Sequence, residues 1–323
     1  MKKTVGENLK MFRIKKGLSM EEAGKKVGVS APAILKYERN KIVASLPRLE
    51  AFAKAYDTSV EEILNIDTSL VIKYDNIYFK EKTSNIKKEN IKNYINTKIE
   101  NYFNLLNLSG ITLHNKFGVH LVNNKKEAQS LATKLRIFFQ IPIDAPIHNL
   151  IYLLENHNII ILTVSKEVSE NAFLGFYEII NNVPIIVVPA AENGYEQRHL
   201  VAKYLGELLI MANGNKEELA ESFAASLLMP EKSLKTEFGD KRVKIHFNEI
   251  IAYSNTYKVS YKNVVKRLLE EEIITASNAK YTNIYINKNQ IHEIAFTEEP
   301  YNYEKMLYKL IAQGLIKDDS KYI

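Results

Sequence analysis

Histidine and carboxylate side chains are the groups in this sequence that could bind a metal ion or transfer a proton. The chain has seven histidines and no cysteine, which excludes disulfide bonds and thiolate metal sites. On a helix, His199 would lie two turns before Glu207, about 11 Å along the axis, which is too far for both to hold one ion. The other histidines have no ligand spacing and are expected at the surface or in the core: His114, His120, His148, His157, His246 and His292. We therefore expect neither a bound metal nor a cofactor.

Lysine and arginine side chains are concentrated near the N-terminus. Residues 1–66 contain thirteen basic and eight acidic side chains, so this first fifth carries +5 of the formal net charge of +6. A local basic excess suits a polyanion such as DNA, although a solvated surface can have the same composition. No apolar run approaches the ~20 residues that a membrane span needs. The N-terminus also lacks the apolar stretch of a signal peptide, so we expect a cytoplasmic protein without a membrane partner.

Five short helices are predicted between residues 5 and 64. Ser19 and Glu22 have the spacing of a capping box at the start of the second helix. Ser30 is placed to cap the third helix, and Pro32 lies in its first turn, where a missing N–H is tolerated. The second helix, a short turn and the third helix have the spacing of a helix-turn-helix. In that motif the third helix enters the major groove of DNA.

Three segments carry a resemblance to the Xre, or phage-repressor, type of helix-turn-helix: Leu18–Ala23, Val27–Ser30 and Ile34–Asn40. The resemblance covers the whole five-helix domain. It implies a DNA-binding transcriptional regulator of the repressor type. It also implies an ion pair between Arg13 and Glu38 that holds the first helix to the third.

The same resemblance implies which residues contact DNA. Ala31, Pro32 and Lys36 would face the bases, and their neighbours would contact the DNA backbone. Members of this family commonly have glutamine at position 20, where Met20 cannot bind phosphate. Ala31 and Pro32 offer only apolar contacts, so DNA specificity is expected to be modest and the operator is not predictable. The predicted DNA-binding residues are Ser19, Met20, Ser30, Ala31, Pro32, Ala33, Lys36, Asn40 and Lys41.

The remainder of the chain predicts helices and a few strands. A strand-like stretch at 71–79 precedes a long amphipathic helix at about 85–107, and Asn181–Asn182 suits a tight hairpin because asparagine tolerates positive φ. Further helices are predicted at 127–140, 146–157, 196–212, 216–228, within 246–274 and near 301–314. Strands are predicted at 159–164, 173–180 and 184–189.

This later sequence resembles the ImmA/IrrE metallopeptidase-like family, in its version fused to an Xre domain. The resemblance rests on segments spread over nearly the full chain, among them Leu135–Arg136, Phe173–Gly175, Pro184–Val188, Phe223–Ala225, Leu227–Pro230 and Tyr257–Ser260. It implies an α+β, mostly helical protein that contains a zincin-like α+β domain with a small sheet. The expected domains are a helix-turn-helix domain at 1–66, a connector with the long linker helix at 67–110, a peptidase-like domain at 111–275 and a helical C-terminal extension at 276–323.

Active members of that family carry H-E-x-x-H on the helix after the strands, and a Glu on the next helix completes the zinc shell. The resemblance places this motif on Lys203–Glu207 and the third ligand on Glu217. Both imidazoles are replaced, and Tyr204 cannot act as the carboxylate base. A pseudo-peptidase with no catalytic residue is therefore implied. An ion pair from Lys203 to Glu207, or to Glu217 across the helix packing, would replace zinc as the link between the helices.

The leading interpretation is a repressor of a mobile element or a toxin–antitoxin-like locus. Its inactive peptidase-like domain would serve sensing, dimerisation or partner binding. Two alternatives stay open: a zinc metallopeptidase that cleaves a repressor, and an antitoxin that acts mainly by binding a protein. The expected partners are double-stranded DNA, a second copy of the chain and a protein encoded by a neighbouring gene. The helix at 85–107 or the C-terminal domain would supply the dimer interface.

Overall fold

The computed structural model describes residues 4–64, 72–191, 193–289 and 291–316. These residues form sixteen helices and six short strands, which confirms the predicted α+β, mostly helical fold. Contacts divide the chain into two compact units. The first comprises Met1–Ile72, Lys92–Leu113 and Tyr301–Ile323, and the second comprises Lys73–Ile91 and His114–Pro300. The domain boundaries at residues 66, 110 and 275 remain sequence-based predictions.

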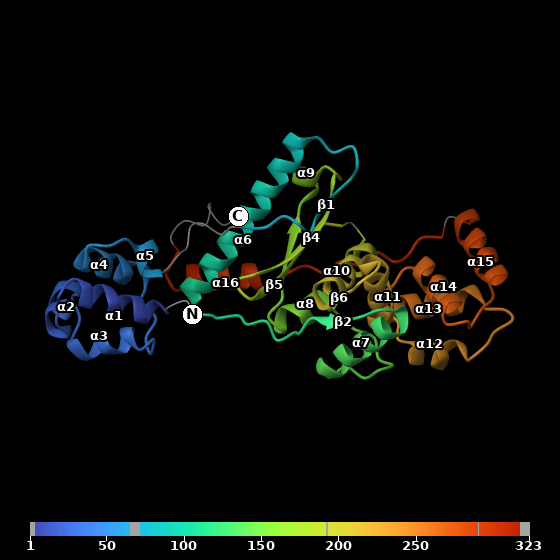
Figure 1. Cartoon of the computed structure of the whole chain (residues 1–323), viewed down its shortest axis with the longest axis horizontal. Helices are drawn as coiled ribbons and strands as arrows, with labels where there is room; N and C mark the ends of the chain where they lie inside the picture. Colours follow the sequence, from blue (N-terminus) through green and yellow to red (C-terminus); the bar gives the residue numbers. More distant parts are fainter. Residues whose placement is uncertain (1–3, 65–71, 192, 290, 317–323) are drawn as a thin grey trace. The chain divides into compact units, whose positions relative to one another are not determined.

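Five helices form the N-terminal domain, as predicted (Figure 1). Leu9, Ile34 and Phe52, from three different helices, are at most 1% exposed and form its core. Ala23 and Val27 of the second helix are also buried, so the second and third helices share this core. The helices are α1 (Val5–Lys15), α2 (Met20–Val27), α3 (Ala31–Glu38), α4 (Leu46–Tyr56) and α5 (Val60–Leu64).

The predicted start and stop signals of α2 are confirmed. The Ser19 hydroxyl accepts the Glu22 backbone N–H, and the Glu22 carboxylate accepts the Ser19 backbone N–H, which forms the capping box. Gly28 ends α2 with φ 75°, a left-handed conformation that costs glycine little. Ser30 occupies the N-cap of α3, but its side chain makes no capping hydrogen bond.

The predicted long helix is α6 (Asn85–Ser109). Its apolar stripe of Ile91, Ile95 and Ile99 is buried within this chain, at 0–1% exposure. Near its end, the Tyr102 ring packs against Tyr303 of α16 (Asn302–Ala312) at 5.7 Å between centroids. This stripe of isoleucines is therefore not an open face for a second copy of the chain.

The second unit contains a four-stranded mixed sheet in the order β1-β4-β5-β3. The predicted hairpin is confirmed, since Asn181 and Asn182 join β4 to β5 with φ 51° and 60°. β3 pairs with β5 in parallel, and β1 pairs with β4 in antiparallel orientation at the sheet edge. The strands are β1 (Ile77–Phe79), β3 (Ile160–Val164), β4 (Phe173–Ile180) and β5 (Val183–Pro189), with β2 (His120–Leu121) and β6 (Ile210–Met211) forming a separate parallel pair.

Helices pack against this sheet and against one another. α10 (Gly194–Leu209) contacts β4 and β5, while α11 (Lys216–Leu228) packs against α10 and against α7 (Lys125–Phe138). The predicted helical stretch at 246–274 is divided at Lys258, which has φ 54°. The other helices are α8 (Leu150–Asn156), α9 (Lys166–Ser169), α12 (Glu231–Phe238), α13 (Phe247–Tyr257), α14 (Tyr261–Glu270) and α15 (Ala276–Lys288). Within the described ranges, no helix combines the length and apolar character needed to cross a bilayer.

Candidate functional site

The solvent face of α3 carries the residues predicted to meet DNA. Lys36 and Pro32 are exposed, and Ala31 and Ala33 are half-buried on the same helix. Lys41 is exposed just beyond the end of α3. Lys36 therefore places one ammonium group on α3, and Lys41 places another just after it. The side chains at the start of α3 are apolar. Ser30 precedes α3 and is exposed, while Ser19 at the N-cap of α2 is exposed and Met20, the first residue of α2, is half-buried.

The predicted ion pair that holds α1 to α3 is present. The Arg13 guanidinium donates to both carboxylate oxygens of Glu38, at 2.5 and 3.1 Å, and also to the Leu18 carbonyl at 2.9 Å. Both side chains are less than 10% exposed. The hydrogen bond from Glu38 raises the pKa of Arg13 above its ordinary value despite burial. Arg13 therefore stays charged, and the pair holds α3 against α1 with Lys36 exposed.

Asn40 has a structural role that the sequence did not reveal. Its side-chain oxygen accepts the Gly6 backbone N–H at 2.8 Å, and its side-chain nitrogen donates to the Thr4 hydroxyl at 2.7 Å. A Cβ on Gly6 would lie 2.5 Å from the Glu38 carbonyl, so α1 approaches the end of α3 closely here. Asn40 therefore ties the start of α1 to the end of α3 while remaining exposed.

Arg48 of α4 fixes the turn of the motif. Its guanidinium donates to the Val27 carbonyl at 2.5 Å and to the Gly28 carbonyl at 3.4 Å. A cation at the C-terminal end of a helix also interacts favourably with the helix dipole. Arg48 therefore holds the end of α2 at the point where the chain turns into α3.

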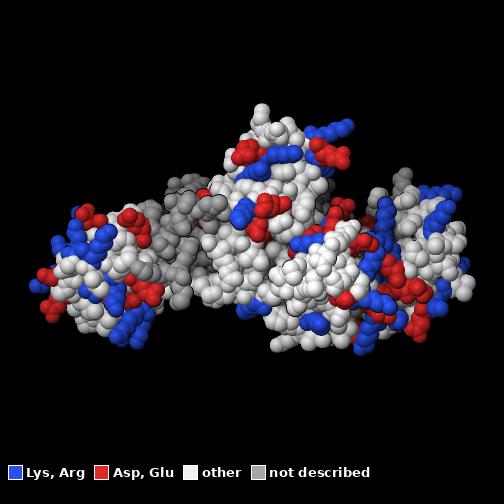
Figure 2. Space-filling model, viewed as in Figure 1, with Lys and Arg blue, Asp and Glu red and all other residues white. Residues whose placement is uncertain are grey.

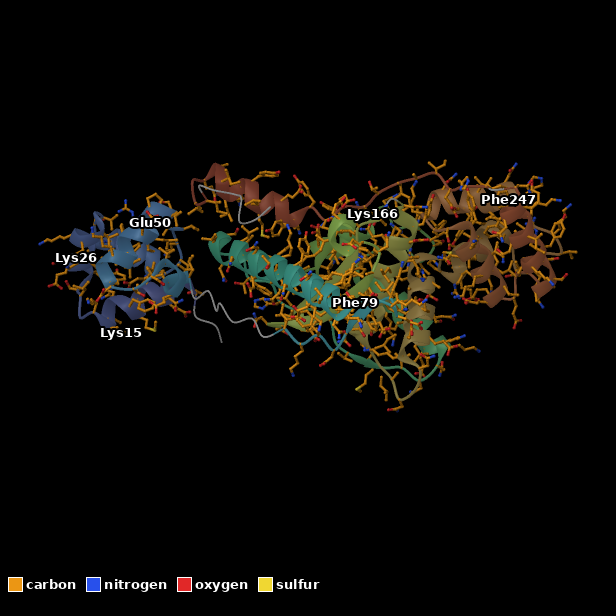
Figure 3. The ribbon with its side chains drawn as sticks, turned by 90° about the horizontal axis from the view of Figure 1, so that it is seen from above. Lys15, Lys26, Glu50, Phe79, Lys166 and Phe247 are labelled. Atoms are coloured by element: carbon orange, nitrogen blue, oxygen red, sulfur yellow. The ribbon has the colours of Figure 1, made fainter. Side chains whose placement is uncertain are left out.

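Charged side chains of both signs are spread over the N-terminal domain. On the face shown in Figure 2, basic and acidic groups alternate and do not form one large basic patch. Lys15, Lys26 and Glu50 project from different sides of the domain (Figure 3). Net charge therefore does not indicate which cations contact DNA phosphates. We identify the candidates by their position on α3 or next to it.

In the second unit, four side chains join α10 to α11, and we call them the ion network. They are His199 and Lys203 on α10, and Glu217 and Glu221 on α11. The Lys203 ammonium lies 2.6 Å from the Glu217 carboxylate and 3.3 Å from that of Glu221. The Nε2 atom of His199 lies 2.8 Å from the other oxygen of Glu221. The predicted pairing of Lys203 with Glu217 is thus confirmed. The predicted pairing with Glu207 is wrong, because the Lys203 side chain reaches across to α11 instead.

Two members of the ion network, Glu221 and Lys203, are charged at neutral pH. The hydrogen bond from His199 lowers the pKa of Glu221 to about 2, against the opposing effect of burial. Burial acts to lower the pKa of Lys203, but the carboxylates of Glu217 and Glu221 outweigh it and hold that pKa above its ordinary value. Glu221 was not identified from the sequence. The matching i, i+4 spacings of His199 and Lys203 on α10 and of Glu217 and Glu221 on α11 are the signal that could have identified it.

Glu207 and Tyr204 face the sheet instead of the ion network. Glu207 is 6% exposed, accepts the Tyr177 hydroxyl at 3.0 Å and lies 3.8 Å from the Lys216 ammonium. The Tyr204 hydroxyl donates to the Leu174 carbonyl at 3.0 Å. Burial raises the pKa of both tyrosines, so they stay protonated as hydrogen-bond donors.

These side chains do not fit a zinc ion. An ammonium group occupies the position between Glu217 and Glu221, and a zinc ion would be repelled by it. Tyr204 and Glu207 already make hydrogen bonds within the protein. In the part of the chain that the structure describes, no group of three or more His, Asp or Glu side chains is arranged to hold a metal ion. Zinc sites of the H-E-x-x-H type need three protein ligands and an open position for water.

A cavity of about 1040 Å³ lies beside these residues, entirely within the second unit. Its wall includes the ion network, the tyrosines Tyr78, Tyr177 and Tyr204, and the buried amide of Gln197. The Gln197 side chain is 3% exposed, and its Nε2 atom has no hydrogen-bond partner in the protein. A volume of this size is at the upper end of those of ligand-binding pockets. The cavity is therefore large enough for a ligand and has an unsatisfied polar group in its wall.

Comparison with known proteins identifies the N-terminal domain. Residues 9–63 match the family model described as helix-turn-helix. No curated protein matches the chain. The domain is therefore a helix-turn-helix domain, the class of fold found in DNA-binding transcription regulators.

Three solved structures show weak similarity to the whole chain. One is a PrgX/iCF10 complex, with 13% identity, coverage of 98% of this chain and 85% of that chain, and a TM-score of 0.20. Another is the apo form of the competence regulator ComR from Streptococcus vestibularis, with 13% identity, coverage of 97% and 98%, and a TM-score of 0.19. The third is a bacterial peptide pheromone/receptor complex, with 16% identity, coverage of 95% and 98%, and a TM-score of 0.19. Similarity at these TM-scores is too weak to inform on function.

Proposed function

We propose that this protein is a DNA-binding transcription regulator of the repressor type that uses its second unit as a sensor or partner-binding module. The helix-turn-helix match over residues 9–63 carries this proposal. The exposed positions of Lys36 and Lys41 support it, because they leave two cations free to meet a base edge and a phosphate. One such domain contacts one half-site. We therefore propose that a dimer binds two half-sites about 34 Å apart.

We further propose that the second unit is a catalytically inactive relative of ImmA/IrrE peptidases. The sequence resemblance places the zinc motif on Lys203–Glu207, and the chemistry of those side chains supports loss of the metal. Lys203 carries a positive charge that Glu217 and Glu221 neutralise. In place of zinc, the ion network then links α10 to α11. The cavity beside it remains available to bind a ligand.

Substitution of Lys36 and Lys41 tests the DNA-binding proposal. Duplexes are first selected from a random library with the wild-type protein. Lys36→Ala should weaken binding to the selected duplex by about 1–3 kcal/mol and affect random DNA much less, because Lys36 would contact a base edge. Lys41→Ala should weaken both alike and flatten the dependence on salt. Lys54→Ala, an exposed cation on α4 outside the predicted set, is the control. Equal losses on both DNAs for Lys36→Ala would contradict the assignment.

Metal analysis tests the pseudo-peptidase proposal. The purified wild-type protein should hold no stoichiometric zinc, and its DNA binding should survive chelators. The triple variant Lys203→His, Tyr204→Glu and Glu207→His restores the motif and should gain zinc affinity while Glu217 is kept. The same variant with Glu217→Gln is the matched control and should lose that gain. About one zinc per wild-type chain would overturn the proposal, and a folded triple variant without zinc affinity would mean that the alignment of α10 is wrong.

A further inference from the structure

Lys216, the first residue of α11, places a cation in the wall of the cavity. The dipole of a helix disfavours a cation at its N-terminal end, where acidic side chains are preferred. The Lys216 ammonium lies 5.6 Å from the centre of the Tyr177 ring and 3.8 Å from the Glu207 carboxylate. Lys216 therefore shows which chemical group this part of the cavity accepts.

The contacts of the Lys216 ammonium are loose. Its distance of 3.8 Å from Oε2 of Glu207 exceeds hydrogen-bond length, and 38% of the Lys216 side chain is exposed. Oε2 accepts the Tyr177 hydroxyl, whereas no hydrogen bond reaches the other oxygen, Oε1, within the described residues. Glu207 is only 6% exposed. A nearly buried carboxylate with one unpartnered oxygen can therefore take a closer ammonium group than Lys216 supplies.

Three tyrosine rings stand beside Glu207. The ring centres of Tyr177 and Tyr204 are 5.4 Å apart, and those of Tyr78 and Tyr204 are 6.0 Å apart. Aromatic faces attract organic ammonium groups. We call Glu207 and these three tyrosines the ammonium subsite. It suits an alkylammonium group, whose charge meets the carboxylate while its methylene groups pack on the rings.

Two further carboxylates line the cavity away from the ammonium subsite. Glu196 is eleven residues before Glu207 on α10, which is about 16 Å along the helix axis. Tyr195 donates to the carbonyl of Ile294, the residue after Glu293, so Glu293 lies at the same end of α10 as Glu196. In the described part of the chain, neither Glu196 nor Glu293 forms an ion pair. The cavity therefore has carboxylates at both ends.

The middle of the cavity does not oppose a positively charged ligand. Five glutamates and three lysines line the cavity, so the lining has an acidic excess. Lys203 lies between the two ends on α10, but Glu217 and Glu221 both pair with it. This distribution of charge suits a linear molecule with a cation at each end.

We propose that the cavity binds a linear polyamine along α10, and that Lys216 occupies the ammonium subsite until the polyamine displaces it. This inference rests on the proposed function, because it names the ligand of the sensing module. One terminal ammonium group takes the place of Lys216 and pairs with Glu207, and the other meets Glu196 and Glu293. Extended spermine is comparable in length to the about 16 Å between the two ends, whereas putrescine is much shorter.

Calorimetric titration of the whole chain with spermine and with putrescine tests the length of the site. Salt at about 0.15 M screens the exposed charges that would bind polyamines without specificity. The wild-type protein should bind spermine at least about tenfold more tightly than putrescine, because only spermine can engage both ends at once. Equal affinities for the two amines would overturn the proposal.

Two substitutions with matched controls test the ammonium subsite. Lys216→Met removes the internal ammonium and keeps an apolar stem, so spermine affinity should rise about threefold to tenfold. Lys232→Met removes the same charge outside the cavity, where Lys232 pairs with Asp144, and should leave spermine affinity unchanged. Glu207→Gln should weaken spermine binding at least about tenfold, and Glu218→Gln, also outside the cavity, should not.

The outcomes separate this inference from the proposed function. A Lys216→Met protein that binds spermine no more tightly than Lys232→Met would overturn the displacement, and far-UV circular dichroism confirms that each variant is folded. Absence of spermine binding in both the wild-type protein and Lys216→Met would overturn the polyamine site. The titration contains no DNA. A protein that binds spermine but no DNA therefore disproves only the proposed DNA-binding function, and one that binds DNA but no spermine disproves only the polyamine site.

Discussion

Glu221 contacts both members of the ion network on α10, His199 and Lys203. The substitution Glu221→Gln should therefore measure how much the network stabilises the packing of α10 on α11. The carboxylate accepts from both His199 and Lys203. Its pKa of about 2 lies below the ordinary 4.5, and each pKa unit corresponds to about 1.4 kcal/mol. The full shift would give about 3 kcal/mol. The side chain is 32% exposed, so solvent screening reduces the expected loss for Glu221→Gln to about 2 kcal/mol at pH 7.

The pH dependence of this loss has a definite sign. A carboxyl group whose pKa is lower in the folded protein stabilises it fully above the unfolded pKa, and the effect disappears as pH falls towards the folded pKa. The difference between wild type and Glu221→Gln should therefore be constant above about pH 5 and shrink between pH 4.5 and 2. Urea unfolding at each pH, followed by far-UV circular dichroism, measures this difference in the free energy of unfolding. Hydrogen exchange of α10 and α11 assigns the loss to the second unit.

Glu218→Gln is the matched control, because Glu218 lies on the same helix and forms an exposed pair with Lys125 at 2.8 Å. An exposed pair is strongly screened by water and salt. The control should therefore change stability much less than Glu221→Gln. A Glu221→Gln protein as stable as the wild type at pH 7, or a loss that does not diminish between pH 4.5 and 2, would refute the reasoning.

Three further substitutions test individual contacts. Gly175→Ala should lower the melting temperature strongly, because φ is 151° and a Cβ would lie 2.1 Å from the Tyr204 ring; Gly214→Ala, whose Cβ meets no atom within 4 Å, should not. Arg48→Met removes both hydrogen bonds at the end of α2 and should cost about 1–2 kcal/mol of stability and weaken DNA binding, as measured by thermal unfolding and titration. Asn40→Ala should cost about 1 kcal/mol by freeing the start of α1, and a variant of unchanged stability would contradict the role given to Asn40.

Local chemistry made much of the fold predictable. The Ser19–Glu22 capping box, the Gly28 stop and the Asn181–Asn182 hairpin each depend on residues close in sequence, and the structure contains all three. The strands around that hairpin were predicted because their apolar runs are short and bounded by turn residues. The helices α9, α12 and α15 were missed, although Pro230 and Gly239 bound α12 and the Thr275 side chain caps α15.

Long-range pairing was much less predictable. β1 was visible only as a strand-like stretch, and nothing near Tyr78 in the sequence indicates β4 as its partner. In the ion network, the alignment with the peptidase motif directed attention to Glu217, the family's ligand position. Glu221 lies one turn later and makes contacts to two residues of α10, but which helix it faces depends on the packing of α10 against α11. Such packing is a property of the folded chain and cannot be obtained from spacing alone.

The ion network and the tyrosines Tyr78, Tyr177 and Tyr204 line the same cavity, but they differ in how easily their side chains can move. The ion network is fixed at neutral pH, because Glu221 stays ionised down to about pH 2 and the pKa of Lys203 is raised. Moving either group would leave a partly buried charge without its partner, which is costly. Among the cavity tyrosines, Tyr177 and Tyr204 make hydrogen bonds to Glu207 and to the Leu174 carbonyl, whereas Tyr78 lies on the three-residue strand β1 and is 40% exposed. Under the proposed sensing role, a ligand in the cavity is therefore expected to move Tyr78, while the ion network keeps α10 and α11 in place.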